Sequence, residues 1–254
     1  MSGRASSRGR RRRLVLGLAT VLGVAKRGFF IPYCYAGRVP KPDRRPPYAE
    51  LESLFAAHEG AFGALLSEID QFAEALGALG GDPPAPRWQQ DWFPRLDGAT
   101  AYAMVRTRTP ARLVEVGSGH STRFFARAAA DGGTATRITA IDPAPRADIG
   151  ALGVEIVAET VQKAGLAPFA ALTAGVLIHV HDVFLPDDYP AEWAWRGYNE
   201  QQGIGALVQG GGFAILWSSR YVATRMADAV DRTVVARLPL GNGAFESSLW
   251  LEKR

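Results

Sequence analysis

The sequence predicts an α/β fold: a doubly wound, mostly parallel sheet with helices on both faces, preceded by an N-terminal helical extension. In its second half, short apolar runs such as ARLVEV, TRITAID and GVLIHVHD alternate with segments of helical spacing. That alternation is typical of successive β-α-β units. The run ARLVEV also leads without a break into a glycine turn, Gly117 to Gly119, which is how a strand enters a helix in such sheets.

The composition is that of an ordinary globular protein. The 254 residues are 47% hydrophobic and 21% charged, enough for one large domain. The net charge is +4, but much of the excess lies in the first 13 residues, SGRASSRGRRRR, so no nucleic-acid partner is expected. Cys34 is the one cysteine, which excludes an internal disulfide and favours a reducing, cytoplasmic location.

The N-terminal segment is apolar with basic flanks. Residues 14–25, LVLGLATVLGVA, are too few to span a bilayer, which takes about 20 apolar residues. No convincing small-residue cleavage site follows, so a signal peptide is not favoured. Residues 10–31 are therefore expected either to contact an anionic membrane surface or to form a partly helical tail that packs on its own domain.

The chain divides into three parts. Residues 1–48 form the basic and apolar segment with a Pro- and Arg-rich linker, residues 49–107 a helical part, and residues 108–254 the α/β domain. Apolar residues from Leu51 to Leu76 recur at helical spacing, and His58 lies on that stripe as a core or boundary residue. The aromatic run WQQDWFP either plugs a seam between helix and sheet or covers a ligand, and we favour the plug.

The α/β part is predicted to contain its elements in a fixed order. A helix over 96–107 leads into the strand ARLVEV. The elements that follow are a helix over 122–130, the strands TRITAID and GVEIVAE, a helix near 161–172, the strand GVLIHVHD, a helix after Tyr198, the strand GGFAILW, a helix near 223–230 and the strand FESSLWLEK. The final strand is predicted to run antiparallel.

The glycine turn is the candidate ligand site. In these sheets ligands bind beyond the carboxyl ends of strands where the strand order reverses. Gly117 and Gly119 allow a tight turn and a close approach of backbone to ligand, and Ser121 or Thr122 can cap the next helix. A plain strand-to-helix turn is the alternative. Asp142 ends the next strand, where it can accept hydrogen bonds from ribose hydroxyls, which favours a nucleoside.

The charge of the residues at the turn indicates which kind of nucleoside ligand would fit there. A dinucleotide-binding turn would need a third glycine where Thr122 stands, and Glu115 has the wrong sign for a pyrophosphate. A nicotinamide-dependent oxidoreductase is therefore disfavoured. S-adenosylmethionine, which carries an ammonium and a sulfonium, fits better.

The segment Glu115-Val-Gly117-Ser-Gly119, with Asp142 closing the next strand, resembles the first two motifs of class I S-adenosylmethionine-dependent methyltransferases, a Rossmann-like family. HVHDVFLPDDYPAEW, with YNEQ downstream, is similar to a bacterial subgroup of them. The resemblance covers about residues 29–254. It implies that Glu115 holds the amino group of the methionine moiety, that the turn lines the methionine and ribose, and that Asp142 binds the ribose. The implied cofactor residues are Glu115, Gly117, Ser118, Gly119, Ser121 and Asp142, with Ser121 in place of the usual third glycine.

One strand of the family pattern is missing. The segment between GVEIVAE and GVLIHVHD is much shorter than the roughly 30 residues that a further β-α-β step takes, and FAALTAG reads as a join after a loss. GVLIHVHD must then pair with the first strand or leave a gap. Because buried parallel sheets tolerate unpaired edges poorly, we predict that Val176 to His181 lies adjacent to Leu113 to Val116.

Catalytic candidates follow the strand GVLIHVHD. Alternation places His179 and His181 on one face and Asp182 on the other. His181 and Asp182 could hold a metal, could supply a general base, or could be structural; we select them as catalytic candidates and expect no metal. His179 is interpreted as a satisfied buried residue. Trp193 and Trp195 either wall a substrate pocket or pack a helix on the sheet.

The predicted function is S-adenosylmethionine-dependent methyl transfer to an oxygen or nitrogen of a small molecule that the sequence does not identify. The alternative is a non-catalytic protein that keeps the fold, a pseudoenzyme or a membrane-surface interaction module, which the missing strand and basic N-terminus favour.

Overall fold

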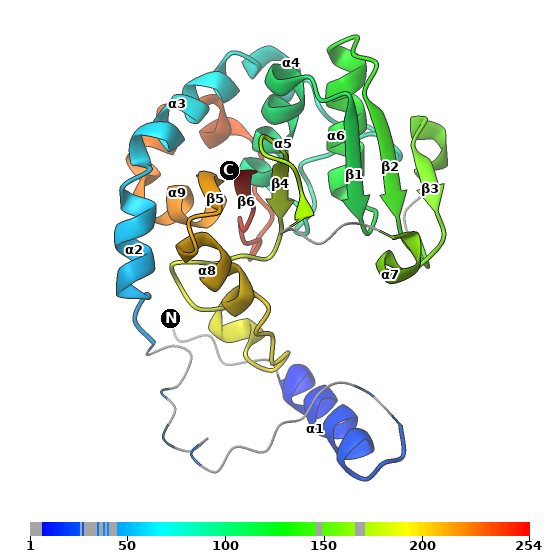
Figure 1. Ribbon diagram of the computed structural model, residues 1–254, viewed down its shortest axis with the longest axis vertical. Helices are drawn as coiled ribbons and strands as arrows, with labels where there is room; N and C mark the ends of the chain where they lie inside the picture. Colours follow the sequence, from blue (N-terminus) through cyan, green and yellow to red (C-terminus); the bar gives the residue numbers. More distant parts are fainter. Residues whose placement is uncertain are drawn as a thin grey trace.

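The computed structural model describes residues 7–25, 27, 35, 38, 40, 45–145, 149–165 and 171–254. Within them the chain is mixed α/β (Figure 1). The strands are β1 (Arg112–Val116), β2 (Arg137–Ile141), β3 (Glu155–Val157), β4 (Leu177–Val180), β5 (Phe213–Ser218) and β6 (Leu249–Lys253). The α-helices are α1 (Ser7–Val21), α2 (Ala49–Ala56), α3 (Glu59–Asp70), α4 (Ala73–Gly77), α5 (Arg95–Arg108), α6 (His120–Asp131), α7 (Val161–Ala164), α8 (Gln201–Gln209), α9 (Ser219–Arg225) and α10 (Ala227–Asp231), and the 3-10 helices are η3 (Gly150–Leu152), η5 (Ala191–Trp193) and η6 (Val234–Arg237).

The strands form two sheets of three. The first has the order β1-β2-β3 and is parallel throughout, so the residues that follow β1 and β2 emerge at the same edge. The second has the order β4-β6-β5, with β6 antiparallel to both neighbours. The prediction of an antiparallel final strand is confirmed. Because β4 and β5 both oppose β6, they run parallel to each other.

The predicted pairing of Val176 to His181 with Leu113 to Val116 is wrong. Among the described residues β1 pairs only with β2, and β4 only with β6, so the two strands belong to separate sheets. Val116 of β1 is 58% exposed. Helix packing explains the separation: α6 follows β1, and its Phe125 ring lies 6.2 Å from His179 in β4, so side chains rather than strand hydrogen bonds hold the sheets together.

Helices α2 and α3 lie on the side of the molecule opposite to β3 (Figure 1). The predicted apolar stripe from Leu51 to Leu76 is divided among α2, α3 and α4. Phe62 of α3 is fully buried and packs edge-on against Trp217 of β5, with ring centroids 6.1 Å apart. His58 lies between α2 and α3, half-buried, with its Nδ1 2.8 Å from the Leu54 carbonyl oxygen, which is the predicted boundary position.

The aromatic run before α5 fills the core. Trp88 and Phe93 are each 3% exposed, and their rings lie 5.0 and 5.8 Å from that of Phe124 in α6. A Cβ on Gly98 of α5 would lie 2.8 Å from the Phe124 ring and 2.9 Å from Trp88, so only glycine fits there. The plug interpretation is confirmed for Trp88 and Phe93, whereas Trp92 is 65% exposed.

Two other predicted helices differ in extent. The helix expected near 161–172 is α7, four residues long, and residues 166–170 lie outside the described part of the chain. The helix expected near 223–230 is divided between α9 and α10. The N-terminal segment is helical as α1, and none of the helices in the described ranges has the length and apolar character required to cross a membrane.

Candidate functional site

The turn between β1 and α6 presents bare backbone to open space. Gly117 has φ of +89°, in the left-handed region that favours glycine. A Cβ built on Gly117 or Gly119 would meet no other atom within 4 Å. The space beside the turn is therefore not filled by described protein atoms, and a ligand can approach the main chain closely.

Glu115 lies inside this turn. The hydroxyls of Ser121 and Thr122 both donate hydrogen bonds to its carboxylate, and the backbone N–H of Gly119 donates to Thr122 Oγ1 over 2.9 Å. Ser121 and Thr122 thus hold Glu115. The N-cap of α6 is Gly119, and Thr122 contributes to the cap as the N3 residue whose hydroxyl accepts the N-cap N–H, whereas Ser121 does not. Burial raises the pKa of Glu115, and the nearby negative charge of Asp142 raises it further.

Asp142 follows β2 and faces the same turn. Ser118 Oγ donates a 2.7 Å hydrogen bond to its Oδ2, and the backbone N–H of Ala144 donates to its Oδ1 over 2.9 Å. The fold therefore brings together all six residues predicted to bind a cofactor. Two carboxylates close enough to influence each other's charge flank half-buried glycines at which a Cβ would meet only open space. His120, the first residue of α6, is half-buried.

His179 of β4 is a structural residue. Its Nε2 lies 2.9 Å from Ser248 Oγ, and its ring packs against Trp250 at 4.8 Å and against Phe93 at 5.7 Å. Burial lowers the pKa of His179 to about 3, so the imidazole is neutral. The interpretation of His179 as a satisfied structural side chain is confirmed, although the residue is half-buried rather than buried.

His181 is held between two carboxylates. Its Nε2 lies 3.2 Å from Asp97 Oδ2, and its Nδ1 lies 3.2 Å from Asp182 Oδ1. Burial disfavours the imidazolium, but the hydrogen bonds and charges of Asp182 and Asp97 outweigh it and raise the pKa of His181 to about 10. Both ring nitrogens therefore carry protons at neutral pH, and His181 is a donor rather than a base.

Asp182 lies just past the end of β4 with φ of +61°. This left-handed conformation ends the strand alternation and turns the side chain back toward the His181 ring. The expectation that the two side chains occupy opposite faces is therefore wrong. The Asp182 side chain is 47% exposed, so it can meet a ligand.

Sequence reasoning missed Asp97. This residue of α5 is fully buried and accepts hydrogen bonds from the backbone N–H groups of Ser247, at 3.1 Å, and Ser248, at 2.9 Å. Burial works to raise the pKa of Asp97, yet the hydrogen bond and charge of His181 and the Ser247 amide hold it below its ordinary value. An acid in the otherwise apolar first turns of a buried helix was the one available signal.

A cavity of about 360 Å³ opens at the carboxyl end of β4. It is lined by Val180, His181, Asp182, Val183, Tyr189, Tyr198, Glu200, Gln201 and Ile204. Neither of the predicted tryptophans lines it. Trp193 instead packs against Phe184 in the loop after β4, with ring centroids 5.1 Å apart, so neither the pocket wall nor helix-to-sheet packing describes it.

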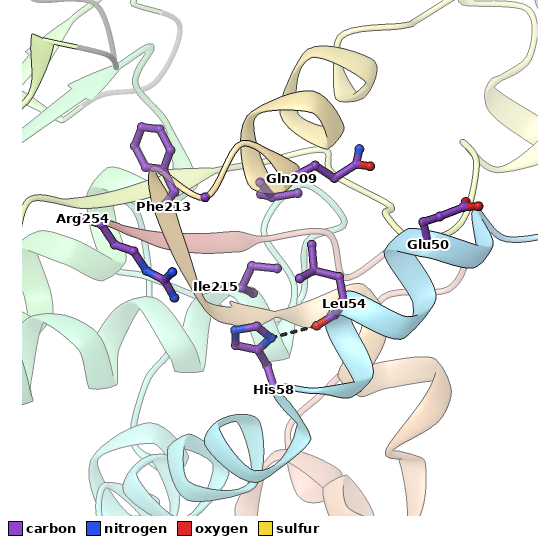
Figure 2. A pocket seen from close by; sticks show the side chains of 9 residues that line it. Glu50, Leu54, His58, Gln209, Phe213, Ile215 and Arg254 are labelled. Carbon is purple, nitrogen blue, oxygen red and sulfur yellow. Dashed lines mark hydrogen bonds between the residues drawn. The ribbon is translucent and has the colours of Figure 1, made fainter.

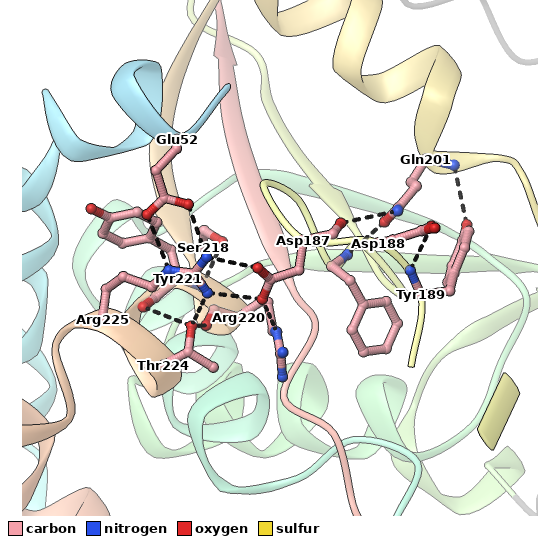
Figure 3. A network of polar contacts seen from close by, with 11 residues as sticks. Glu52, Asp187, Asp188, Tyr189, Gln201, Ser218, Arg220, Tyr221, Thr224 and Arg225 are labelled. Carbon is pink, nitrogen blue, oxygen red and sulfur yellow. Dashed lines mark hydrogen bonds and ion pairs between the residues drawn. The ribbon is translucent and has the colours of Figure 1, made fainter. Parts of the chain in front are cut away.

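The loop that borders this cavity is fixed by a polar network (Figure 3). Asp187 accepts hydrogen bonds from Arg220 at 2.7 Å and from Arg225 at 2.7 and 2.8 Å. Arg225 also binds Glu52 of α2, at 2.8 Å. On the other side, Gln201 Nε2 donates to the Asp187 carbonyl oxygen over 3.2 Å. The network ties the loop to α2, α8 and α9.

A second pocket, also of about 360 Å³, lies at the opposite end of the second sheet (Figure 2). Its lining includes Phe213, where β5 begins, and Arg254, which follows β6, together with His58 and Glu50 from the helical part. Because β4 and β5 are parallel, this pocket lies at the amino edge of the sheet. It is thus separate from the residues that follow the strands' carboxyl ends.

No group of three or more His, Cys, Asp or Glu side chains within the described ranges is arranged to hold a metal ion. Comparison of the chain with protein-family models, with curated proteins and with solved structures found no match.

Proposed function

We propose that this chain binds S-adenosylmethionine at the turn Gly117 to Gly119 and that its activity is methyl transfer to an oxygen or nitrogen of a small molecule. The supporting observation is the pair of carboxylates, Glu115 and Asp142, beside open glycine backbone. The fold that accompanies this proposal is a doubly wound, Rossmann-like sheet that has lost one strand between β1 and β4.

The site residues fit such a ligand. Asp142 and Glu115 repel each other, and an ammonium or sulfonium group beside them would relieve that repulsion. A carboxylate that follows β2 can accept hydrogen bonds from the two ribose hydroxyls in place of the one that Ser118 now donates. The backbone of Gly117 and Gly119 is open enough for the methionine moiety to lie against it.

S-adenosylmethionine, when bound, supplies an electrophilic methyl group. The chain's own contribution is position and proton acceptance. Asp182 is the exposed carboxylate at the cavity next to β4, so it is the residue that takes the proton from the attacking hydroxyl or amine. His181 donates a hydrogen bond to Asp182 and orients it, while Asp97 fixes the imidazolium from behind.

Titration of the full chain with S-adenosylmethionine and S-adenosylhomocysteine tests this proposal. We expect saturable binding by the wild type and an affinity lower by about tenfold or more in Asp142→Ala, because a charged hydrogen bond is worth about 1.5–3 kcal/mol. Asp228→Ala, an exposed acid in α10, should bind like the wild type. Absence of wild-type binding, or equal binding by Asp142→Ala, would contradict the proposal.

A second candidate function is contact with a membrane surface, favoured by α1 and the residues after it. Their exposed apolar side chains, 50–77% accessible, are Leu14, Val15, Leu18, Val21, Leu22 and Val24. Arg11 to Arg13 lie beside them and would interact with anionic lipid. Against this, Arg13 donates a 3.1 Å hydrogen bond to the Ala194 carbonyl oxygen, so the helix also contacts its own domain.

Co-sedimentation with vesicles tests the membrane contact. The wild type should pellet with phosphatidylserine vesicles, and a Leu18→Asp, Leu22→Asp variant should remain in the supernatant, because an acidic group in place of each apolar side chain opposes burial beneath the headgroups. Leu240→Asp, which places the same acid at an exposed apolar position remote from α1 in sequence, is the matched control. Equal pelleting of the wild type and the double variant would rule out this contact.

A further inference from the structure

The cavity beside β4 has an excess of negative charge. Its charged lining residues are His181, Asp182 and Glu200. The imidazolium of His181 is already neutralised by Asp97, which is buried behind it and does not line the cavity. Two carboxylates therefore remain to face the interior, and no cation of the described lining offsets both.

One of these carboxylates is held in place. Glu200 Oε2 accepts a hydrogen bond from the backbone N–H of Asn199, at 3.0 Å, and one from the hydroxyl of Tyr189, at 3.3 Å. Burial, together with the charge of Glu200, raises the pKa of Tyr189 to about 12, so its hydroxyl stays protonated and remains a donor. These two hydrogen bonds position the Glu200 carboxylate in the lining without a ligand.

Aromatic rings form another part of the lining. The rings of Tyr189 and Tyr198 lie edge to face, with centroids 6.0 Å apart. Both also contact Trp193, which lies behind them. The guanidinium of Arg196 lies 4.1 Å from the Trp193 centroid and 5.5 Å from that of Tyr198, outside the cavity lining. The cluster already attracts one cation through its ring faces, as aromatic surfaces do.

We propose that this cavity binds a small organic cation, an arylalkyl or alkyl amine. Its ammonium group pairs with Asp182 and Glu200, and its apolar part packs on the two tyrosine rings and on Val180 and Ile204. The volume of about 360 Å³ lies within the range of small-molecule sites, about 300–1,000 Å³. A carboxylate or phosphate ligand would meet two like charges, and a neutral one would gain no ion pair with either carboxylate.

The site can be considered with or without catalysis. If the cavity is the pocket for the methyl acceptor, the inference rests on the proposed function and assigns amines as the substrate class. As a binding site it depends only on the cavity, so it can be tested without S-adenosylmethionine. A failure of the amine-binding proposal can therefore be distinguished from a failure of the methyl-transfer proposal.

The experiment compares three probes of matched shape on the full chain: 2-phenylethylamine, 2-phenylethanol and 3-phenylpropanoate. Binding is measured by saturation-transfer NMR and calorimetry. The amine should bind saturably, about tenfold or more tighter than the alcohol, and the carboxylate should bind most weakly. Affinity for the amine should fall as salt is raised, because ions screen its pairing with partly exposed carboxylates.

Substitutions in the lining test whether Asp182 and Glu200 are the carboxylates that bind the amine. Asp182→Asn and Glu200→Gln each preserve size while removing charge. Each should therefore weaken binding of the amine by about tenfold and reduce the difference in affinity between the amine and the alcohol. Glu192→Gln, an exposed acid in η5 that does not line the cavity, should bind like the wild type. Thermal melting of each variant confirms that it is folded.

Three results would overturn the proposal. They are wild-type binding of none of the probes, equal affinity for amine and alcohol, and retention of full amine affinity by folded Asp182→Asn and Glu200→Gln. If the amine binds and S-adenosylmethionine does not, the cavity assignment stands and methyl transfer falls. If S-adenosylmethionine binds and the amine does not, the amine assignment alone falls.

Discussion

Replacing Asp97 with alanine should destabilise the fold by about 3–5 kcal/mol, the range for removing one partner of a buried ion pair. The carboxylate is fully buried and neutralises His181. Asp97 also accepts hydrogen bonds from the backbone N–H groups of Ser247 and Ser248, which precede β6. Its loss leaves the His181 imidazolium with Asp182 as its remaining acid and leaves two buried backbone donors without this acceptor. Urea unfolding, followed by circular dichroism, gives the change in unfolding free energy.

The pH dependence of the unfolding free energy separates the contribution of the charges on Asp97 and His181 from that of their packing. The pKa of His181 is raised from 6.5 to about 10, so this group's stabilisation is complete below pH 6.5 and is lost as the pH rises through about 10. The lowered pKa of Asp97 acts on the acid side, where stability falls only below its ordinary 3.8. Asp182 and His179 are the other titratable groups beside the ring.

Asp97→Asn is the matched control. It preserves size and an acceptor oxygen but removes the charge, so it should be less destabilising than alanine and should flatten the fall in wild-type stability between about pH 7 and pH 10. A loss below about 1 kcal/mol in Asp97→Ala, the level of an exposed pair, would show that the ion pair contributes little. An unchanged alkaline slope in Asp97→Asn would show the same.

Asp187→Ala should destabilise the fold by about 2–3 kcal/mol, less than a fully buried pair because its arginine partners are partly exposed. Its side chain is 15% exposed and accepts three hydrogen bonds, two of them from Arg225 (Figure 3). Removing it leaves Arg220 and Arg225 without their shared acid and detaches the loop that borders the cavity from α9, while Gln201 still donates to the backbone carbonyl oxygen at this position. Thermal and urea unfolding measure the loss.

Glu52→Gln is the control for Asp187. Arg225 keeps its two bonds to Asp187 in that variant, so the expected loss is below about 1 kcal/mol. Because the loop between Phe184 and Pro190 supplies Tyr189 to the cavity, amine affinity should fall in Asp187→Ala and persist in Glu52→Gln. Equal destabilisation by the two substitutions would contradict the central place of Asp187 in this network.

Much of the fold was accessible from local pattern. Alternating apolar runs located the strands, and the end of the chain was recognised as an antiparallel strand. The glycine turn and Asp142 were predicted together because parallel neighbours emerge at one edge of a sheet. The breaks that divide residues 49–77 into three helices were not predicted, since Ala57 and Gln71 are compatible with an uninterrupted helix.

The sequence by itself determined the strands and the carboxylate-flanked turn, because periodicity and turn chemistry act over a few residues. Only the tertiary structure decided that β1 and β4 lie in separate sheets, since β4 pairs instead with β6 from the end of the chain. It alone placed Asp97 against His181, 84 residues away. A contact between distant segments depends on how helices pack on sheets, and that packing energy is spread over many side chains with no local signature.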